Sequence, residues 1–368
     1  VACSAGSWTT GVRNLTGVND DAAIEFDANQ TDTATNTGYA TQLSAIKDTV
    51  DPLVTIDAVG SINASTVGAY TVTGTCTNGD GVVTYTISSP SGGTDATTSV
   101  VCSSGSWTTG ALNLAALNDN GAVEFDAYQT DSNANTGYAD QLTAIKDVIL
   151  PVVVIDAVSI VNATNETSYT VTGSCTTGDG SVSYTISSPS GGTDSTGSVA
   201  CSAGTWTTGL LNLSAVDDDA AVEFDANQTD TASNTGYATQ LTVIKDTDIP
   251  LVTINGVSTI NNANKSSYSI SGTCSFGDGD VTYNISSPSG GTDVTGTTVC
   301  NVGGLWSQGS LSLLGINDNS AIEFDANQTD SNSNTGYAIQ LNAIKDTVDP
   351  VVGIDALSPI NATNVTSY

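Results

Sequence analysis

Aspartates and asparagines recur in close groups, and they are the residues of this sequence best suited to hold a ligand. They lie in a D-x-x-x-N loop that occurs four times and in the linkers that follow it. Calcium takes six to eight oxygen ligands, which carboxylates and amide carbonyls supply. We therefore predict calcium as the one cofactor, bound by these residues: Asp32, Asn36, Asp48, Asp51, Asp131, Asn135, Asp230, Asn234, Asp246, Asp248, Asp330, Asn334, Asp346 and Asp349.

A second interpretation of the same residues needs no metal. Asp and Asn side chains accept hydrogen bonds from nearby backbone N–H groups and stabilise turns in that way. The linker at 146–151 favours this account, because it reads K-D-V-I-L-P and keeps only Asp147. A strict calcium site in the linker would not survive that loss, so the sequence leaves both interpretations open.

Six of the seven cysteines fall into three pairs at one constant spacing. A metal site is disfavoured, because the sequence has no C-x-x-C motif and no histidine. We predict three disulfides, Cys76–Cys102, Cys175–Cys201 and Cys274–Cys300, each of which stabilises its domain by about 3–4 kcal/mol. Cys3 has no partner in the sequence. Disulfides persist in oxidising compartments, so we expect a secreted or cell-surface protein.

Catalysis has no candidate residues. Without histidine, neither a Ser-His nor a Cys-His pair can form. Paired carboxylates serve glycosidases, but here the acidic positions recur in every repeat, which is typical of structural positions. The sequence therefore predicts that the protein is not an enzyme.

The negative net charge excludes some classes of binding partner. The 368 residues include 38 acidic and 6 basic side chains, for a net charge of −32. Nucleic acids and anionic membrane surfaces repel such a chain, because both are bound through Lys and Arg. No run of 18 apolar residues is present, so we expect no membrane insertion in this segment.

One lysine recurs in each repeat, and so does one glutamate within an apolar strand. A salt bridge near the end of the domain is the main interpretation, and an intramolecular isopeptide crosslink is the alternative. The residues are Lys47, Lys146, Lys245 and Lys345, with Glu25, Glu124, Glu223 and Glu323.

The elements that must position these residues repeat about every 99 residues, as the spacing of Trp8, Trp107 and Trp206 shows. A proline opens each unit, because proline cannot donate to a strand ladder and suits a strand start. We predict three complete domains, 51–148, 149–247 and 248–347, called repeats A, B and C below. They are flanked by partial domains at 1–50, the C-terminal part of a unit, and at 349–368, a first strand.

Alternating apolar and polar residues predict seven strands in repeat A, at 53–59, 70–76, 82–88, 98–102, 107–114, 122–129 and 138–145. Turns rich in Gly, Asn and Asp separate them. The fold class is therefore all-β, with tandem Ig-like antiparallel β-sandwich domains and one disulfide in each. We expect the repeated tryptophan to pack in the core near that disulfide.

The repeat unit resembles the bacterial Ig-like domains of giant extracellular adhesins and biofilm surface proteins. The matching segments are P-L-V-T-I-D-A-V-G-S-I-N, Y-T-V-T-G-T-C, G-S-W-T-T-G-A-L-N-L, Q-T-D-S-N-A-N-T-G and K-D-T-V-D-P. The cysteine pair departs from that pattern. The resemblance implies an extracellular stalk or fibre, often stiffened by calcium, and names no ligand.

Two functions of different classes follow. The first is a structural stalk, fibre or filament, whose partners are neighbouring domains of the same long chain or other filament subunits. The alternative is a multivalent adhesin module that binds cell-surface carbohydrate or a receptor. A weaker alternative is a filament subunit that exchanges strands head to tail.

Overall fold

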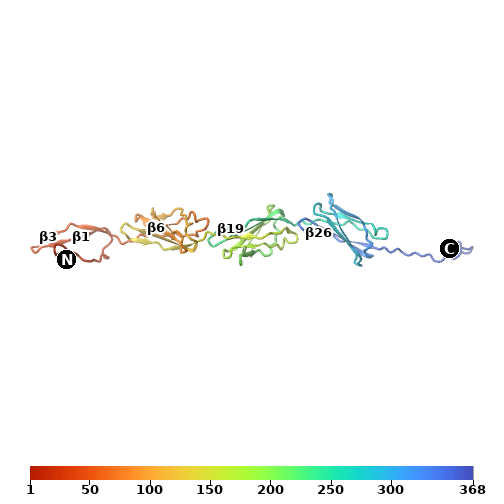
Figure 1. Cartoon of the computed structure of the whole chain (residues 1–368), viewed down its shortest axis with the longest axis horizontal. Helices are drawn as coiled ribbons and strands as arrows, with labels where there is room; N and C mark the ends of the chain where they lie inside the picture. Colours follow the sequence, from red (N-terminus) through yellow and green to blue (C-terminus); the bar gives the residue numbers. More distant parts are fainter. Residues whose placement is uncertain (368) are drawn as a thin grey trace. The chain divides into compact units, whose positions relative to one another are not determined.

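The computed structural model describes residues 1–367, and within them the chain forms strands, bridges and turns without a helix (Figure 1). Its contacts divide the chain into two compact units. The first unit holds Val1–Val152, Thr176–Gly180 and Gln228–Gly236, and the second holds the rest. Within the described residues no helix has the length and apolar character needed to cross a bilayer.

The strands of the first unit form antiparallel sheets. Residues 1–50 contribute the pairs β1 (Asp21–Phe26) with β4 (Leu43–Lys47) and β2 (Asn29–Thr31) with β3 (Thr37–Tyr39). Repeat A has a small sheet of β5 (Thr73–Thr75) and β8 (Ser106–Thr108). Its large sheet has the order β10 (Thr136–Tyr138), β9 (Asn120–Thr130), β6 (Val82–Ser88), β7 (Ala96–Val101), and β11 (Leu142–Lys146) also pairs with β9.

The second unit repeats this architecture. Its strands are β12 (Val154–Ile155), β13 (Val161–Asn162), β14 (Thr172–Ser174), β15 (Ser181–Ser187), β16 (Ser195–Ala200), β17 (Thr205–Thr207), β18 (Asp219–Thr229), β19 (Thr235–Tyr237) and β20 (Leu241–Asp246), with the end of β18 and most of β19 in the first unit. Repeat C adds β21 (Tyr268–Thr273), β22 (Val281–Ser286), β23 (Val294–Thr298), β24 (Leu305–Leu311), β25 (Asn319–Thr329), β26 (Thr335–Tyr337) and β27 (Leu341–Lys345). Repeat C has the sheets β21–β24 and β23–β22–β25–β26, with β27 on β25.

Strict alternation along β9 explains why this segment is the central strand of its sheet. Val123, Phe125 and Ala127 are buried, whereas Glu124 and Asp126 between them point to the outer face. Successive side chains of a strand point to opposite faces, so one face packs in the core and the other is hydrated. Each repeat has its own cluster of buried residues, so the predicted fold of tandem antiparallel β-sandwiches is confirmed.

A disulfide joins the two layers of each sandwich. Cys76 follows β5 and Cys102 follows β7, and their Cα atoms lie 6.0 Å apart. The bonds Cys175–Cys201 and Cys274–Cys300 repeat this arrangement. All three predicted pairs are therefore present, each within its own repeat, and Cys3 is free and exposed.

The tryptophan on β8 is a core residue, as predicted. Trp107 is buried, stacks on Tyr85 with ring centroids 6.2 Å apart, and donates its indole hydrogen to the carbonyl oxygen of Thr55 at 3.0 Å. Gly74 makes this approach possible, because a Cβ atom there would lie 2.0 Å from the same carbonyl oxygen. The glycine of the T-G-T segment is therefore required by packing and not by a turn.

Four predicted strands of repeat A differ from those in the structure. The segments 70–76 and 107–114 are shortened to β5 and β8. The segment 53–59 is not a continuous strand in repeat A, although Thr55 and Asp57 donate backbone hydrogen bonds to β5. The segment 138–145 is divided between β10 and β11, which pair with different parts of the long β9. The alternation gave the right residues but missed the break between the two strands.

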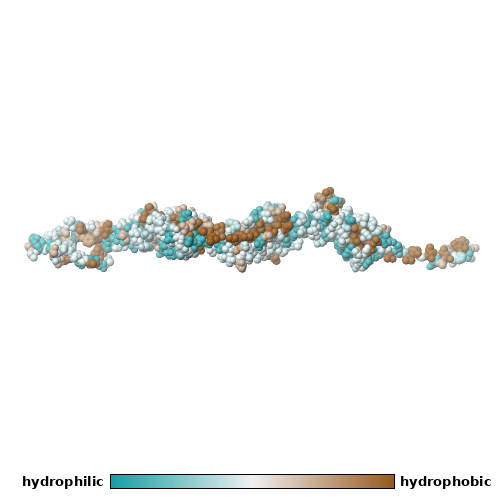
Figure 2. Space-filling view, in the orientation of Figure 1, coloured by the Kyte–Doolittle hydropathy of each residue, from teal (hydrophilic) through white to brown (hydrophobic). Residues whose placement is uncertain are grey.

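Sequence motifs that are buried in the complete repeats are exposed in the flanking segments. Trp8 is 56% exposed, whereas its equivalent Trp107 is 3% exposed. Val352 and Ile360 are exposed, although Val54 and Ile62 at the same positions of repeat A are core residues. Figure 2 shows hydrophobic side chains on the surface of the segment that begins at residue 349, because no sheet covers them there.

Candidate functional site at the repeat junctions

The D-x-x-x-N loop between β9 and β10 closes on itself through its aspartate. In repeat A, Asp131 accepts backbone hydrogen bonds from Asn133 and Asn135 at 2.8 and 2.9 Å, and the Asn135 amide at 2.8 Å. These donors, chiefly the Asn135 amide, lower the pKa of Asp131 below its usual value. The loop is therefore an Asx turn that holds its asparagine in a fixed position.

That asparagine also holds the linker that enters its repeat. The amide of Asn234 donates to the carbonyl oxygen of Asp147 at 2.9 Å, and the amide of Asn334 donates to that of Asp246 at 2.9 Å. Asn135 makes the same contact with Asp48 at 3.3 Å. The loop thus binds the linker backbone in all three complete repeats.

A turn of the preceding repeat completes each junction. Asn63 donates its amide hydrogen to the carbonyl oxygen of Ala232 at 3.0 Å, and the backbone N–H of Ala64 donates to Asn234 Oδ1 at 2.8 Å. These residues all belong to the first unit. The side chain of Asn234 therefore contacts its own loop, the linker and the previous repeat at once.

The junction between repeats B and C has the same bonds within the second unit. Asn162 donates to the carbonyl oxygen of Asn332 at 3.0 Å, and Ala163 N–H donates to Asn334 Oδ1 at 2.8 Å. Here Asn332 adds a bond to the carboxylate of Asp246 at 2.7 Å. The residue equivalent to Asn332 in repeat B is Ala232, which has no side-chain amide. The two junctions therefore differ by one amide–carboxylate bond.

A buried lysine fixes the end of the last strand of each repeat. Lys146 pairs with Asp119 at 2.5 Å, Lys345 pairs with Asp318 at 2.5 Å, and Lys245 pairs with Asp218. Lys47 makes the same pair with Asp20. The predicted salt bridge is present, but its partner is this aspartate and not the recurring glutamate, which lies on the outer face of β9.

The paired aspartate also anchors the linker. Asp318 accepts hydrogen bonds from the backbone N–H and the hydroxyl of Thr347, both at 2.9 Å. The contacts of Lys345 and Thr347 lower the pKa of Asp318 to about 2. The sequence analysis did not identify Asp318 or its equivalents. A signal was present, because an aspartate lies 27 residues before the lysine of each I-K-D segment.

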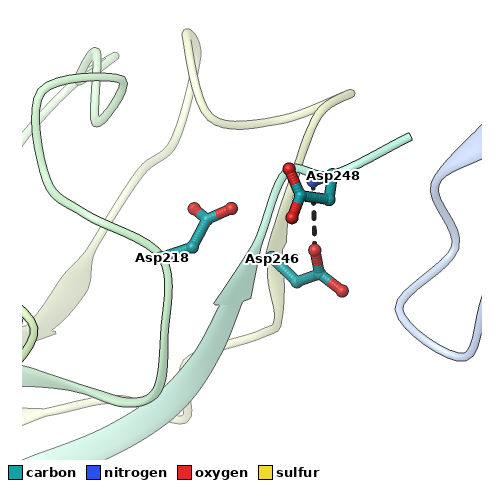
Figure 3. Close-up of side chains that lie close together, drawn as sticks. All are labelled: Asp218, Asp246 and Asp248. Carbon is teal, nitrogen blue, oxygen red and sulfur yellow. Dashed lines mark hydrogen bonds between the residues drawn. The ribbon is translucent and has the colours of Figure 1, made fainter. Parts of the chain in front are cut away.

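Carboxylates gather where the linker leaves repeat B. Ligand oxygens of Asp218, Asp246 and Asp248 lie within 4.8 Å of one another (Figure 3). Asp218 is already paired with Lys245, and Asp246 accepts the backbone N–H of Asp248 at 3.0 Å. Among the described residues, no donor bonds to the carboxylate of Asp248, so this group is free to take a cation.

Two aspartates near the junctions are less acidic than usual. Burial, followed by the charges of Asp330 and Asp246, raises the pKa of Asp278. Burial, followed by the charges of Asp230 and Asp147, raises the pKa of Asp179. Each junction therefore concentrates negative charge around a hydrogen-bonded loop.

The oxygens of the predicted calcium residues are largely engaged by N–H donors. Asp32, Asp131, Asp230 and Asp330 bind their own loop asparagines, Asn36, Asn135, Asn234 and Asn334, and the linker residues Asp48, Asp346 and Asp349 accept Val50 N–H, Val348 N–H and the Asn262 amide. A calcium ion needs free oxygen lone pairs. The loops therefore form Asx turns. Asp246 also accepts two hydrogen bonds, so Asp248 is the linker aspartate whose carboxylate accepts none within the described residues.

The strands, the layered cores and the recurring disulfides define a chain of tandem Ig-like β-sandwich repeats with hydrogen-bonded junctions. No protein-family model matches the sequence, and no curated protein matches it.

Among solved structures, the chain is similar to a tetra-tandem repeat in the extending region of a large adhesion protein, with 18% identity over 91% of this chain and 84% of that one and a TM-score of 0.32. It is also similar to fibronectin(III)-like modules of Clostridium thermocellum CbhA, with 15% identity over 52% and 95% and a TM-score of 0.31. A marsupial T cell receptor matches with 9% identity over 74% and 96% and a TM-score of 0.33.

Proposed function

We propose that this chain is a structural extracellular protein, a stalk, fibre or filament of a surface adhesin or biofilm component. The observation that carries the proposal is the recurrence of one set of junction bonds. Repeats A and B are joined through Asn63 and Asn234, and repeats B and C through Asn162 and Asn334, with the same donors and acceptors. A spacer built from identical units requires junctions that are the same each time.

The linkers support the same function. Each linker is a few residues long, and the loop asparagine binds its backbone, so it does not act as a free hinge. Flexible linkers are rich in Gly and Ser, whereas these contain Lys, Asp and Pro. The three disulfides suit an oxidising environment outside the cell. We assign the repeats no catalytic role.

Scattering from the full chain tests this function. The wild-type protein should give a narrow distribution of its longest dimension, because the junction bonds fix neighbouring repeats. The double variant Asn234→Ala/Asn334→Ala should give a broader distribution with unchanged strand content. If the wild-type distribution were as broad as that of the variant, the proposal of a spacer with fixed junctions would be contradicted.

In this proposal calcium binds at fewer residues than the sequence analysis predicts. We place it at the carboxylates of Asp246 and Asp248, where the linker leaves repeat B. There it would neutralise two adjacent charges and hold the linker, and would take no part in the cores. The equivalent of Asp248 is Ile149 at the preceding junction, so that junction would not respond to calcium.

A further inference from the structure

Three groups of tyrosines recur along the chain, and two of them serve the fold. Tyr70 is buried, and its hydroxyl donates to the carbonyl oxygen of Gly60 at 2.6 Å. Tyr85 is buried against Trp107. The third group is different, because its rings are 74–79% exposed and its hydroxyls have no hydrogen bond within the described residues. It comprises Tyr39, Tyr138, Tyr237 and Tyr337.

An exposed tyrosine shares the outer face of its sheet with two carboxylates. In repeat A, Tyr138 is directly opposite Tyr128, and Asp126 and Glu124 follow Tyr128 on the outer face of β9. Residues directly opposite each other in an antiparallel pair lie on the same face of the sheet. We call this group the tyrosine face. It consists of Tyr138, Asp126 and Glu124 in repeat A; Tyr39, Asp27 and Glu25; Tyr237, Asp225 and Glu223; and Tyr337, Asp325 and Glu323.

A glutamine orients one of the two carboxylates. Gln141 donates its amide hydrogens to both oxygens of Asp126, at 3.1 and 3.2 Å. Gln240 and Gln340 hold Asp225 and Asp325 in the same way. The position of the carboxylate relative to the sheet is therefore the same in each repeat.

The chain has few cations that could pair with these carboxylates. Four of its six basic residues are used by the aspartate pairs at the ends of the last strands, and only Arg13 and Lys265 are left. Within the described residues, no ion pair involves Glu124, Asp126 or their equivalents. These carboxylates can therefore pair with a cation of another molecule.

The tyrosine recurs within an N-T-G-Y-A segment that is the same in all four copies, and one position close to it varies. The residue two positions after it is Thr41, Asp140, Thr239 or Ile339, so this position varies in charge and polarity. The tyrosine itself is the same in all four copies, although its ring contributes little to any core.

We infer that the tyrosine face of each repeat binds an arginine- and lysine-rich segment of another protein. A guanidinium or ammonium group is attracted to the face of an aromatic ring, and the adjacent carboxylates accept its hydrogen bonds. Guanidinium suits the site best, because it is planar, stacks on rings and carries several donors. The inference goes beyond a structural role, since none of these residues belongs to a junction.

Because the tyrosine face recurs along the chain, several weak contacts can add up to a higher overall affinity. A single exposed cation–aromatic contact contributes little on its own. Binding of a second site by the same partner is an intramolecular step, so a partner with several basic groups gains in overall affinity. The net charge of −32 would also speed its association.

The experiment uses the full chain and a fluorescent nine-residue oligoarginine peptide, titrated in about 150 mM salt, where long-range attraction is screened. Replacing all four exposed tyrosines by alanine keeps the net charge and should weaken binding about 2- to 5-fold at each site. The four corresponding Tyr→Phe substitutions keep the rings and should restore wild-type affinity. Unchanged binding by the alanine variant would overturn the inference.

Two matched triple variants separate the face from general charge attraction. Asp126→Asn/Asp225→Asn/Asp325→Asn removes three carboxylates from the face, and Asp95→Asn/Asp194→Asn/Asp293→Asn removes three from exposed loops. The first should weaken binding clearly more than the second. Equal weakening would show that binding depends on net charge alone and would overturn the inference. The inference would also be overturned if the chain bound an uncharged oligosaccharide through these tyrosines and did not bind the peptide.

Discussion

Asn234 donates its amide hydrogen to the carbonyl oxygen of Asp147, 87 residues earlier in the chain, while its own carbonyl oxygen accepts the backbone N–H of Ala64. One side chain therefore connects a loop, a linker and a neighbouring repeat. The sequence presents Asn234 as a possible metal ligand, but in the structure its polar atoms bind protein groups. This connection leads to the first prediction.

Asn234→Ala should loosen the junction between repeats A and B without unfolding either core. The substitution removes bonds worth about 0.5–1.5 kcal/mol each. Hydrogen exchange should show faster exchange at the N–H of Ala64, while the N–H groups of β9 keep their protection. Asn36→Ala is the matched control, because Asn36 bonds to Asp32 in the same type of loop but to no neighbouring repeat. Unchanged exchange at Ala64 would show that this bond does not hold the junction.

Reduction of the disulfides should lengthen the unfolding steps of a stretched chain. The Cys76–Cys102 bond spans a separation of 26 residues and withholds that segment from extension. An extended residue spans at most about 3.3–3.6 Å, so each step should grow by about 80–90 Å after reduction. Force measurements on single chains with and without reductant give the result, and equal steps in both conditions would contradict the assignment of the bond as a mechanical constraint.

The Lys345–Asp318 pair should make repeat C sensitive to acid. The pKa of Asp318 is about 2 in the folded protein, whereas the usual value for an aspartate is 3.8. A lowered folded pKa adds stability that is fully present above pH 4 and is lost as the pH falls toward 2. The free energy of unfolding of Asp318→Asn should therefore lie below that of the wild type at neutral pH, and the difference should shrink between pH 4 and 2.

Asp95→Asn is the control for the acid experiment. Asp95 is exposed and makes no ion pair within the described residues, so its substitution changes the same charge without breaking a bond. Its free energy of unfolding should follow that of the wild type at all pH values. A pH-independent deficit in Asp318→Asn would show that the pair does not titrate as described.

Calcium should act on the junction between repeats B and C and not on that between A and B. Calcium should slow hydrogen exchange at Asp248 and Thr247, where the carboxylates of Asp246 and Asp248 lie close together, and chelator should reverse it. Asp248→Ile copies the residue at 149 and should abolish the response. A response at both junctions, or at neither, would contradict this placement.

Most of the fold could be predicted from the sequence because its signals are local. Alternation identified the central strand of repeat A within a few residues, and the constant spacing identified Cys76 with Cys102 as a pair. Turn residues then fixed the connections. These features depend on neighbouring residues or on the repeat itself, and both can be read from one chain.

The partners of polar side chains could not be predicted in this way, because they depend on long-range packing. Lys146 and Asp119 are 27 residues apart, and the glutamate at 124 looked like an equally good partner. The alternation of β9 decides between them only once the sheet is formed, since it turns Glu124 to the outer face. Burial is likewise a property of the whole repeat: Trp8 and Trp107 have the same neighbours in sequence, yet only Trp107 is covered.

The disulfide of each repeat encloses an exposed glycine-rich loop. Residues 90–95 of repeat A are exposed and lie between Cys76 and Cys102. Exposed loop tips are preferred sites of proteolysis. A protease that cuts this loop breaks the backbone, but the two parts stay joined through sulfur. A chain of such repeats can therefore be nicked once in every unit and still hold together, as long as its surroundings are oxidising.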